Sequence, residues 1–405
     1  MKKFVFLFVA ISFFSCNNDD PQGDLLSVAV PILMNKTEFR NSVEVQSPHP
    51  IDETGKIYAY DQYIFVNNKF HGIQVIDNTN PSSPKAISYI KIPGNVDIAI
   101  KNNYLYADSS TDLVVFDISN INQIGVVARM EDVFSIYDYQ IPENADYADF
   151  GTFNNAEDII VGWTIEQRES SSVYGGGIEL FDAALSNSNI GTGGSLARFQ
   201  IFEDYLYTVA SHEMTIFNIN NLSQPTLFST EYAGNNIETL FETDGFLYLG
   251  STDGMYIYGL DNPEAPNYVS EFVHWTGCDP VVVDGDYAYL TIRGGNNCGD
   301  QESVLEVIDI SNKNIPTLAA TYSLDNPYGL GLNNNNLFVC DGGSGLKVFD
   351  KTNPLSLQLV QTFSSVKSKD VIPLPNTLLM IGDNVLYQYE YINDAINLIS
   401  TFQLD

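Results

Sequence analysis

A short apolar segment that ends in an acidic residue recurs along most of the 405-residue chain, and its spacing constrains the fold more than any other feature. The clearest copy is Gly345–Asp350, which runs into the turn Lys351–Pro354. Apolar side chains at every second position are typical of a strand with a buried face. The copies are, in order, Gly72–Asp77, Asp112–Asp117, Gly177–Asp182, Glu213–Asn218, Gly254–Gly259, Val304–Asp309, Gly345–Asp350 and the looser Val385–Glu390.

The ends of most neighbouring copies lie about 40 residues apart. Asp77 and Asp117 are separated by 40 positions, and so are Asp350 and Glu390. The distance from Asp117 to Asp182 is 65 positions, which we interpret as one unit with an insertion. A period near 40 residues with several strands in each unit indicates a β-propeller.

Each unit holds enough sequence for four antiparallel strands. A short aromatic strand such as Tyr104–Tyr106 precedes the repeated strand, and a further strand such as Val96–Ile100 precedes the aromatic one. A fourth strand follows, as at Ala86–Ile90. The predicted fold is therefore all-β, a β-propeller of four-stranded antiparallel blades over residues 51–405. The repeats predict eight blades, with seven as the alternative if the loose last copy is an outlier.

The repeated pattern resembles the LVIVD repeat, a propeller-forming family found in surface lipoproteins of Bacteroidetes and in secreted bacterial proteins. The resemblance extends from about Gly55 to the C-terminus. It is also carried by Gly94–Asp108, Gly277–Val283 and Asn326–Gly331. It implies a propeller fold, and no established activity comes with it.

The first 15 residues are predicted to be a lipoprotein signal peptide. Lys2 and Lys3 precede an apolar run that is too short to span a bilayer and that ends at Cys16. We expect Cys16 to be acylated and to become the mature N-terminus; the alternative is an ordinary secretion signal with an incidental cysteine. Residues 16–50 would then form a lipidated tether, in which residues 28–33 could add a strand or cross one face of the ring.

The residues that follow Cys16 and the net charge of the chain indicate where in the cell the protein is located. The stretch Asn17–Asp20 resembles the acidic signal that directs such lipoproteins to the outer face of the outer membrane; the periplasmic leaflet is the alternative. A formal net charge of −33 repels nucleic acid and anionic lipid headgroups. We therefore expect a monomer that contacts the outer membrane through its lipid anchor and binds no nucleic acid.

Charged residues are predicted at one mouth of the central channel, because the first strand of each blade lines that channel. Aligning the units on their aromatic strands places six of them at or beside the start of the first strand: Lys56, Asp97, Arg198, Glu238, Asp279 and Asp370. These side chains could converge on a polar ligand or an ion. Alternatively, they are solvated at the rim or cap backbone groups.

Residues 130–150, the insertion, combine carboxylates with tyrosines such as Tyr137 and Tyr147. Long loops often carry the specificity of a scaffold. The insertion could stack on a sugar ring or bind calcium, or it could be a solvated acidic loop. Its spacing matches no calcium-binding loop such as Asp-x-Asp-x-Asp-Gly. We expect no cofactor and no metal ligands, with calcium as the one candidate.

Three cysteines follow Cys16. Cys278 precedes the first strand of the sixth unit, and Cys298 lies between its second and third strands. Both positions fall on the same face of an up-and-down blade, so we predict a Cys278–Cys298 disulfide in an oxidising compartment. The alternative pairs Cys298 with Cys340, which is otherwise the odd thiol.

Catalysis has little support in the sequence. The four histidines fall in separate places, and neither Gly-x-Ser-x-Gly nor His-Glu-x-x-His occurs. Two hypotheses remain. The first is a surface-anchored binding or interaction module whose partner is a protein or a glycan of the envelope. The second is an envelope hydrolase that acts on glycans or esters with carboxylates at the channel mouth. The absence of catalytic motifs favours the first.

Overall fold

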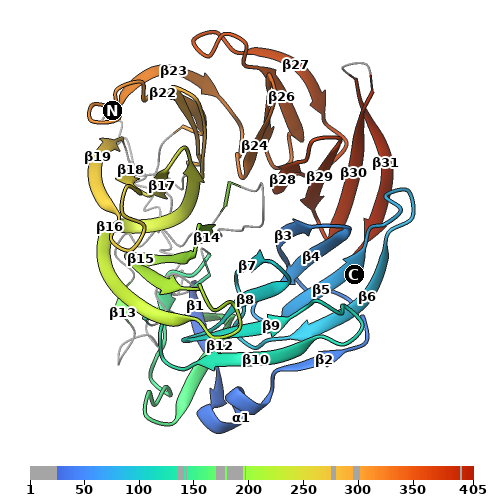
Figure 1. The fold of residues 1–405 in the computed structure, drawn as a ribbon, viewed down its shortest axis with the longest axis vertical. Helices are drawn as coiled ribbons and strands as arrows, with labels where there is room; N and C mark the ends of the chain where they lie inside the picture. Colours follow the sequence, from blue (N-terminus) through green and yellow to red (C-terminus); the bar gives the residue numbers. More distant parts are fainter. Residues whose placement is uncertain are drawn as a thin grey trace, which may run out of the picture.

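The computed structural model describes residues 25–135, 141–142, 144–169, 178–179, 195–196, 198–274, 280–294, 302–392 and 395–405. Within these ranges the chain is β-rich, and its one helix, α1 (Lys36–Asn41), has 6 residues. Figure 1 shows sheets arranged around a common centre. The predicted all-β class with four-stranded antiparallel sheets is confirmed. In the described part of the chain no helix is long and apolar enough to cross a membrane.

Most sheets follow the chain order, with the first strand of each at the centre (Figure 1). The first sheet contains β3 (Thr54–Tyr60), β4 (Tyr63–Asn68), β5 (Gly72–Asp77) and β6 (Lys85–Lys91), with β2 (Glu44–Gln46) added at its outer edge. The second contains β7 (Ile98–Lys101), β8 (Tyr104–Ser109), β9 (Asp112–Asp117) and β10 (Gly125–Met130).

The later four-stranded sheets repeat this arrangement. One contains β20 (Val281–Asp284), β21 (Tyr287–Ile292), β22 (Val304–Asp309) and β23 (Thr317–Ser323). The next contains β24 (Leu330–Asn333), β25 (Asn336–Cys340), β26 (Leu346–Asp350) and β27 (Gln358–Phe363). The last contains β28 (Asp370–Pro373), β29 (Thr377–Gly382), β30 (Val385–Ile392) and β31 (Ala395–Gln403).

A six-stranded sheet in the middle of the chain holds two of the predicted units. Its strands are β14 (Phe199–Phe202), β15 (Tyr205–Asn218), β16 (Thr226–Thr243), β17 (Phe246–Ser251), β18 (Gly254–Gly259) and β19 (Asn267–Val273). The long strand β16 pairs with β15 through its first half and with β17 through its second half. The outer strand of one unit therefore continues directly into the first strand of the next.

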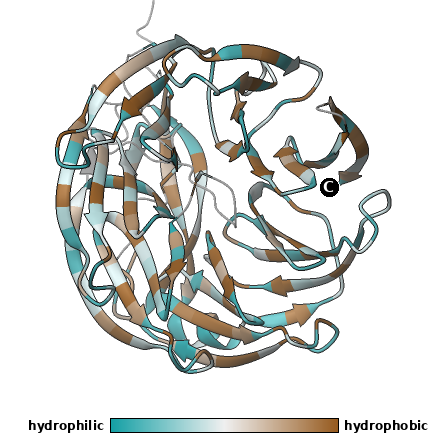
Figure 2. Ribbon diagram, turned by 45° about the horizontal axis from the view of Figure 1, so that its top comes forward, coloured by the Kyte–Doolittle hydropathy of each residue, from teal (hydrophilic) through white to brown (hydrophobic). Residues whose placement is uncertain are grey.

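The repeated strands form where they do because their apolar side chains pack between neighbouring sheets. Phe65 and Val75 of the first sheet share a core cluster with Ile100 and Leu105 of the second. Figure 2 shows the apolar bands that recur along the strands. Each fully buried side chain of this size contributes about 1.5–3 kcal/mol to folding. The stability of each sheet therefore depends on its packing against the neighbouring sheets, as expected of a repeat architecture.

Steric crowding explains why several copies of the repeated strand begin with glycine. Gly72 and Gly345 have positive φ values of 146° and 90°. A Cβ atom on Gly72 would lie 2.0 Å from the carbonyl oxygen of Ile90, and one on Gly345 would lie 2.1 Å from that of Phe363. The outer strand of the sheet leaves no room for a side chain at this position.

The acidic end of the repeated strand is a turn residue. Asp77 accepts the backbone N–H of Thr79 at 2.9 Å, and Asp350 accepts that of Thr352 at 2.8 Å. Asp117 and Asp309 make the same contact with Ser119 and Ser311. Hydrogen bonds from the hydroxyl groups of the same Thr and Ser residues, and then these backbone contacts, hold the pKa of each of the four carboxyl groups below its usual value.

The first and last sheets pack against each other. Ile57 and Ile64 share a core cluster with Leu379 and Leu386, and β28 contacts β3. Close to the C-terminus, Leu404 accepts the backbone N–H of Ile51 at 2.7 Å. The two ends of the repeat region are thus held together.

The third predicted unit does not form a sheet of the repeated kind. Its described residues, β13 (Ile178–Glu179), pair with β11 (Tyr147–Ala148), which runs parallel to β1 (Leu25–Asn35). β12 (Asp158–Glu169) pairs with the other side of β1. We call this the insertion sheet. Meanwhile β7 of the second sheet contacts β14 directly. The prediction that Gly177–Asp182 is the repeated strand of a further blade is therefore wrong for its described residues, Ile178–Glu179, because the chain leaves the series of repeated sheets after Met130.

Residues 25–46, which the sequence places in the tether, contribute β1, α1 and β2 to this folded part. Asn35 caps α1 by accepting the backbone N–H of Thr37 at 3.0 Å. Phe39 of α1 is buried against Ile159 and Val161 of β12. The expectation that residues 28–33 could add a strand is confirmed.

An ion-pair cluster joins α1 to the second sheet. Arg40 contacts Asp112 at 3.1 Å, Glu131 at 2.8 Å and Asp132 at 3.0 Å. Arg129 adds a contact of 2.8 Å to Asp112, whose side chain is fully buried. Ser110 of the same sheet donates to the carbonyl oxygen of Ile160 in β12 at 2.8 Å.

We predict that Arg40→Ala lowers the free energy of unfolding by about 2 kcal/mol, because it removes one partner of a buried carboxylate. The measurement is urea denaturation followed by tyrosine and tryptophan fluorescence. Arg168→Ala is the control, since its partners Asp149 and Glu166 are solvent-accessible; it should cost about 0.5 kcal/mol. Equal losses for the two variants would contradict this role of Arg40.

Candidate functional site

The charged residues that the sequence assigns to the channel mouth lie at or beside the starts of the inner strands. Lys56 is in β3, Asp97 precedes β7, Arg198 precedes β14, Glu238 is in β16 and Asp370 begins β28. Asp279 lies outside the described residues. All five described side chains are buried, with exposed fractions between 0% for Asp370 and 5% for Arg198. They are therefore not solvated at a rim.

Asp97 links three sheets. It forms an ion pair of 2.8 Å with Lys56, both side chains being 1% exposed. One oxygen of Asp97 accepts the backbone N–H groups of Arg198 and Phe199, each at 3.0 Å. The other accepts the N–H of Ile98 at 2.7 Å. This geometry fits the alternative in which these residues cap backbone groups.

The short segment before β14 reaches a distant sheet. The hydroxyl oxygen of Ser195 accepts the backbone N–H of Leu330, the first residue of β24, at 2.8 Å. Ser195 is buried, and so is Leu196. Side chains of the chain itself thus satisfy several backbone groups at the inner strands.

Burial shifts the pKa values of the central charges. It lowers the pKa of Lys56 to about 8, against the opposing effect of Asp97. It raises the pKa of Asp370 to about 8, against the N–H of Val371 and the charge of Lys56. One oxygen of Asp370 accepts that N–H at 2.9 Å, and the other has no hydrogen-bond partner among the described residues. A protonated Asp370 at neutral pH is consistent with this environment.

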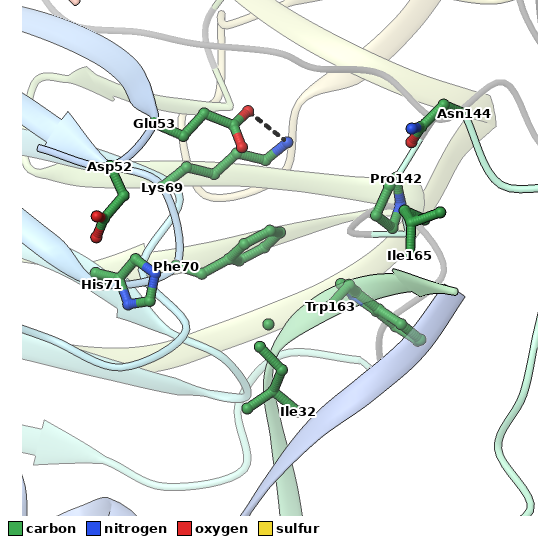
Figure 3. A pocket seen from close by; sticks show the side chains of 11 residues that line it. Ile32, Asp52, Glu53, Lys69, Phe70, His71, Pro142, Asn144, Trp163 and Ile165 are labelled. Carbon is green, nitrogen blue, oxygen red and sulfur yellow. Dashed lines mark ion pairs between the residues drawn. The ribbon is translucent and has the colours of Figure 1, made fainter. Parts of the chain in front are cut away.

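A pocket of about 590 Å³ lies elsewhere, between the first sheet and the insertion sheet (Figure 3). One side comes from the β4–β5 hairpin and the residues before β3: Asp52, Glu53, Lys69, Phe70 and His71. The other side comes from β1, β12 and the insertion: Ile32, Pro142, Asn144, Gly162, Trp163 and Ile165. This volume suits a small ligand.

The pocket combines an apolar surface with charged groups on one side. Figure 3 shows the ring of Phe70 between Lys69 and the residues of the insertion sheet. Trp163 is buried in the core of that sheet, with its ring 5.6 Å from the ring of Phe150 in an edge-on arrangement. The Lys69 ammonium group lies 3.6 Å from Glu53 and 5.2 Å from the centre of the Phe70 ring. Apolar walls with a few polar groups are typical of ligand sites.

The backbone of Phe70 is left-handed, with a φ of 65°. This conformation costs a residue with a side chain about 1–2 kcal/mol, and it is unusual for an aromatic residue. The turns of the second sheet and of β15 have small residues here, Ser110 with a φ of 50° and Ser211 with a φ of 49°. Hydrogen bonds of 2.8 Å from Phe70 N–H to Asn95 and from Gly94 N–H to Phe70 hold the turn. Such strain occurs preferentially at functional sites.

Sequence reasoning pointed to part of this pocket and missed the rest. The insertion, residues 130–150, was a candidate for specificity, and it supplies Pro142 and Asn144. Asp52, Glu53 and residues 69–71 were not singled out. The available signal was Phe70, a bulky residue at a turn where two other repeats have serine, Ser110 and Ser211.

The cysteine predictions fall mostly outside the described residues. This holds for Cys16 and for the proposed pair Cys278 and Cys298. Cys340 is buried and is not in a disulfide, and burial raises the pKa of its thiol. In the described part of the chain, no group of three His, Cys, Asp or Glu side chains is arranged to hold a metal ion.

Comparison with family models finds the LVIVD repeat in four stretches, residues 53–89, 94–131, 193–231 and 278–323. These repeats confirm the resemblance drawn from the sequence at the level of a repeat family. The predicted third copy, Gly177–Asp182, lies outside the matched stretches, in agreement with its position in the insertion sheet. The comparison with curated proteins found no match.

Several solved structures share the fold at low sequence identity. A functionally unknown protein from Desulfotomaculum acetoxidans DSM 771 has a TM-score of 0.54 and 12% identity, over 85% of this chain and 100% of the other. A protein from Lactobacillus plantarum has a TM-score of 0.52 and 12% identity, over 87% and 95%. The computationally designed Ika8 protein has a TM-score of 0.51 and 9% identity, over 88% and 89%. The likeness shows a propeller-like fold and carries no function.

The raised pKa of Asp370 predicts a pH dependence of stability. The unfolded carboxyl group loses its proton near pH 4 and the folded one near pH 8, so its stabilising contribution falls as the pH rises between these values. We expect the melting temperature of Asp370→Asn, relative to the unmodified protein, to rise across this range. Scanning calorimetry at several pH values measures the difference.

Asp261→Asn, at an exposed carboxyl group, provides the control for Asp370→Asn and should show no such trend. The buried Asp108, whose pKa is raised to about 6, is common to all three proteins and cancels in the comparison. Parallel pH profiles for Asp370→Asn and the unmodified protein would contradict the raised pKa.

Proposed function

We propose that this protein is a lipid-anchored binding protein of the bacterial cell envelope whose ligand is a glycan. In this proposal Cys16 carries the lipid, and the folded part stands on the outer face of the outer membrane, as in the surface lipoproteins of Bacteroidetes that contain LVIVD repeats. The observation that supports the binding function is the pocket of about 590 Å³ that Phe70 helps to line.

We infer that the sheets form a closed propeller of seven blades, the alternative count from the sequence. Two contacts support closure: β28 lies against β3, and the first and last sheets share a core cluster. The insertion sheet supports the lower count, because the residues of the third predicted unit pair outside the ring.

A glycan fits the chemistry of the pocket. The C–H face of a sugar ring packs on an aromatic or aliphatic wall through dispersion, and Phe70, Ile32 and Ile165 supply such a wall. Sugar hydroxyl groups donate hydrogen bonds to carboxylates, and Asp52 and Glu53 stand at the edge of the same pocket. The volume of about 590 Å³ lies within the usual range of pockets for small ligands.

Among the described residues of the channel mouth, Asp97 and Asp370 do not favour the hydrolase hypothesis. Asp97 accepts three backbone N–H groups and pairs with Lys56, and Asp370 is fully buried. A glycosidase needs two carboxyl groups that reach the bond to be cleaved. We therefore retain the binding function as the proposal.

The test of glycan binding uses Phe70→Ser, which installs the residue found at the same turn of the second sheet. We expect the affinity for envelope oligosaccharides to fall at least tenfold, as is usual when a central aromatic contact is removed. Ligands are found on a glycan array and quantified by isothermal titration calorimetry. Phe228→Ser, at an exposed aromatic side chain of β16, should bind normally. Unchanged binding by Phe70→Ser would place the ligand elsewhere.

The anchor is tested separately with the full chain expressed in a Gram-negative host. Cys16→Ala should abolish labelling by a clickable fatty acid and shift the protein from the membrane to the soluble fraction, because a thioether-linked lipid is then impossible. Protease treatment of intact cells distinguishes the outer face from the periplasmic face. Membrane retention of unlabelled Cys16→Ala would refute the lipid anchor.

A further inference from the structure

Three tyrosines are grouped on the six-stranded sheet, which contributes no residue to the pocket. Tyr232 on β16 is 68% exposed, and Tyr268 on β19 is 54% exposed. Tyr256 on β18 is partly buried, and it interacts electrostatically with both of them. We call these three side chains the tyrosine patch. Exposed aromatic groups that lie together, and not singly, are a feature of protein–protein contact sites.

Hydrogen bonds and ring contacts fix the tyrosine patch where β16 passes from one unit to the next. The Tyr232 hydroxyl donates to the side-chain oxygen of Asn235 at 2.8 Å, and the Tyr256 hydroxyl accepts the backbone N–H of Asn235 at 3.2 Å. Tyr268 packs edge-on against the buried Tyr258, with the ring centres 5.7 Å apart. Because the rings are already held in place, a partner that binds them loses less entropy in ordering them.

A carboxylate lies beside the tyrosine patch. Glu271 is the partner of Tyr256 in the pairing of β18 with β19, so the two side chains project from the same face of the sheet. Burial, and then the negative charge of Glu271, raises the pKa of Tyr268, which places this carboxylate close to the second ring as well. Glu271 is exposed, and in the described part of the chain it forms no ion pair with a lysine or arginine. Its charge is therefore available to a partner.

The charge and the chemistry of the patch favour an arginine side chain. The chain carries a formal net charge of −33, so it attracts a cationic partner and repels an anionic one. A planar guanidinium group stacks on an aromatic face, and its N–H groups can bind a carboxylate such as Glu271 at the same time. Tyrosine and arginine are both enriched among the residues that contribute most to binding at protein interfaces.

We propose that the tyrosine patch is a docking surface for an arginine-containing segment of a partner protein. One arginine of this segment stacks on the exposed ring of Tyr268 and binds the carboxylate of Glu271, and a second arginine stacks on Tyr232. This surface is separate from the glycan-binding function, because it shares no residue with the pocket.

The test compares two labelled peptides with the full chain at physiological ionic strength. The cationic probe has six arginines separated by glycines. In the neutral probe citrulline replaces each arginine, which keeps the shape of the side chain and removes its charge. Fluorescence anisotropy gives both affinities, and we expect the arginine peptide to bind at least about tenfold more tightly.

Variants separate the patch from the overall charge of the chain. Tyr268→Leu keeps an apolar side chain but removes the aromatic face, and it should weaken binding of the arginine peptide about threefold, whereas Tyr268→Phe should bind normally. Glu271→Gln should weaken binding by a similar factor. Asp61→Asn, at an exposed carboxylate between β3 and β4, is the matched control for charge and should bind normally.

Each contrary outcome overturns a stated part of this inference. Equal affinities for the two peptides overturn the selection for arginine. Equal losses for Glu271→Gln and Asp61→Asn show that the peptide responds to net charge alone, and they overturn the docking surface. Equal losses for Tyr268→Leu and Tyr268→Phe, with unchanged melting temperatures, overturn the stacking. Phe70→Ser should keep its full affinity for the arginine peptide; a loss there places the peptide in the pocket and overturns a separate surface, whatever the glycan array shows.

Discussion

The inner strands of the sheets carry buried backbone N–H groups, and the architecture depends on satisfying them. A buried N–H without an acceptor is costly, so each must find a partner. Asp97 accepts the N–H groups of Arg198 and Phe199 from the neighbouring sheet, and Ser195 accepts that of Leu330. Lys56 then balances the charge of Asp97. Asp97 therefore connects three sheets, and its role as an acceptor of backbone N–H groups accounts for its burial.

The candidate site lies where the repeat is interrupted. The chain leaves the ring after the second sheet, pairs with the N-terminal strand β1, and returns at β14. The insertion sheet packs beside the β4–β5 hairpin. The ion pair of Arg40 with Asp112 and the hydrogen bond from Ser110 to Ile160 hold it in place. The first hairpin carries Phe70 in a strained conformation at the side of the resulting pocket. The series of repeated sheets thus gains a candidate site where the insertion sheet packs beside it.

Sequence reasoning succeeded where the pattern is local and failed where distant segments meet. The alternation within Gly72–Asp77 identifies a strand, and Asp77 identifies the turn behind it, because both depend on neighbours in the chain. The alignment that collected Lys56, Asp97 and Asp370 at equivalent positions was sound, yet it could not tell a solvated mouth from a buried joint. Gly177–Asp182 looked like the other copies, yet its described residues, Ile178–Glu179, belong to a different sheet. Its apolar residues permit a strand, and only the available partners decide which one.

The sequence by itself determined the repeated strands, their turns and the repeat family, since side-chain alternation and turn chemistry act over a few residues. It also supplied the steric demand for glycine at the start of the repeated strand, although the carbonyl group that imposes the demand belongs to another strand. Tertiary structure alone decided that Asp97 would be buried, that residues 25–35 would complete the insertion sheet, and that Phe70, Glu53 and Ile165 would line one pocket. These outcomes depend on contacts between residues more than one hundred positions apart, and hydrophobic burial, which has no direction along the chain, selects among them only when the whole chain packs.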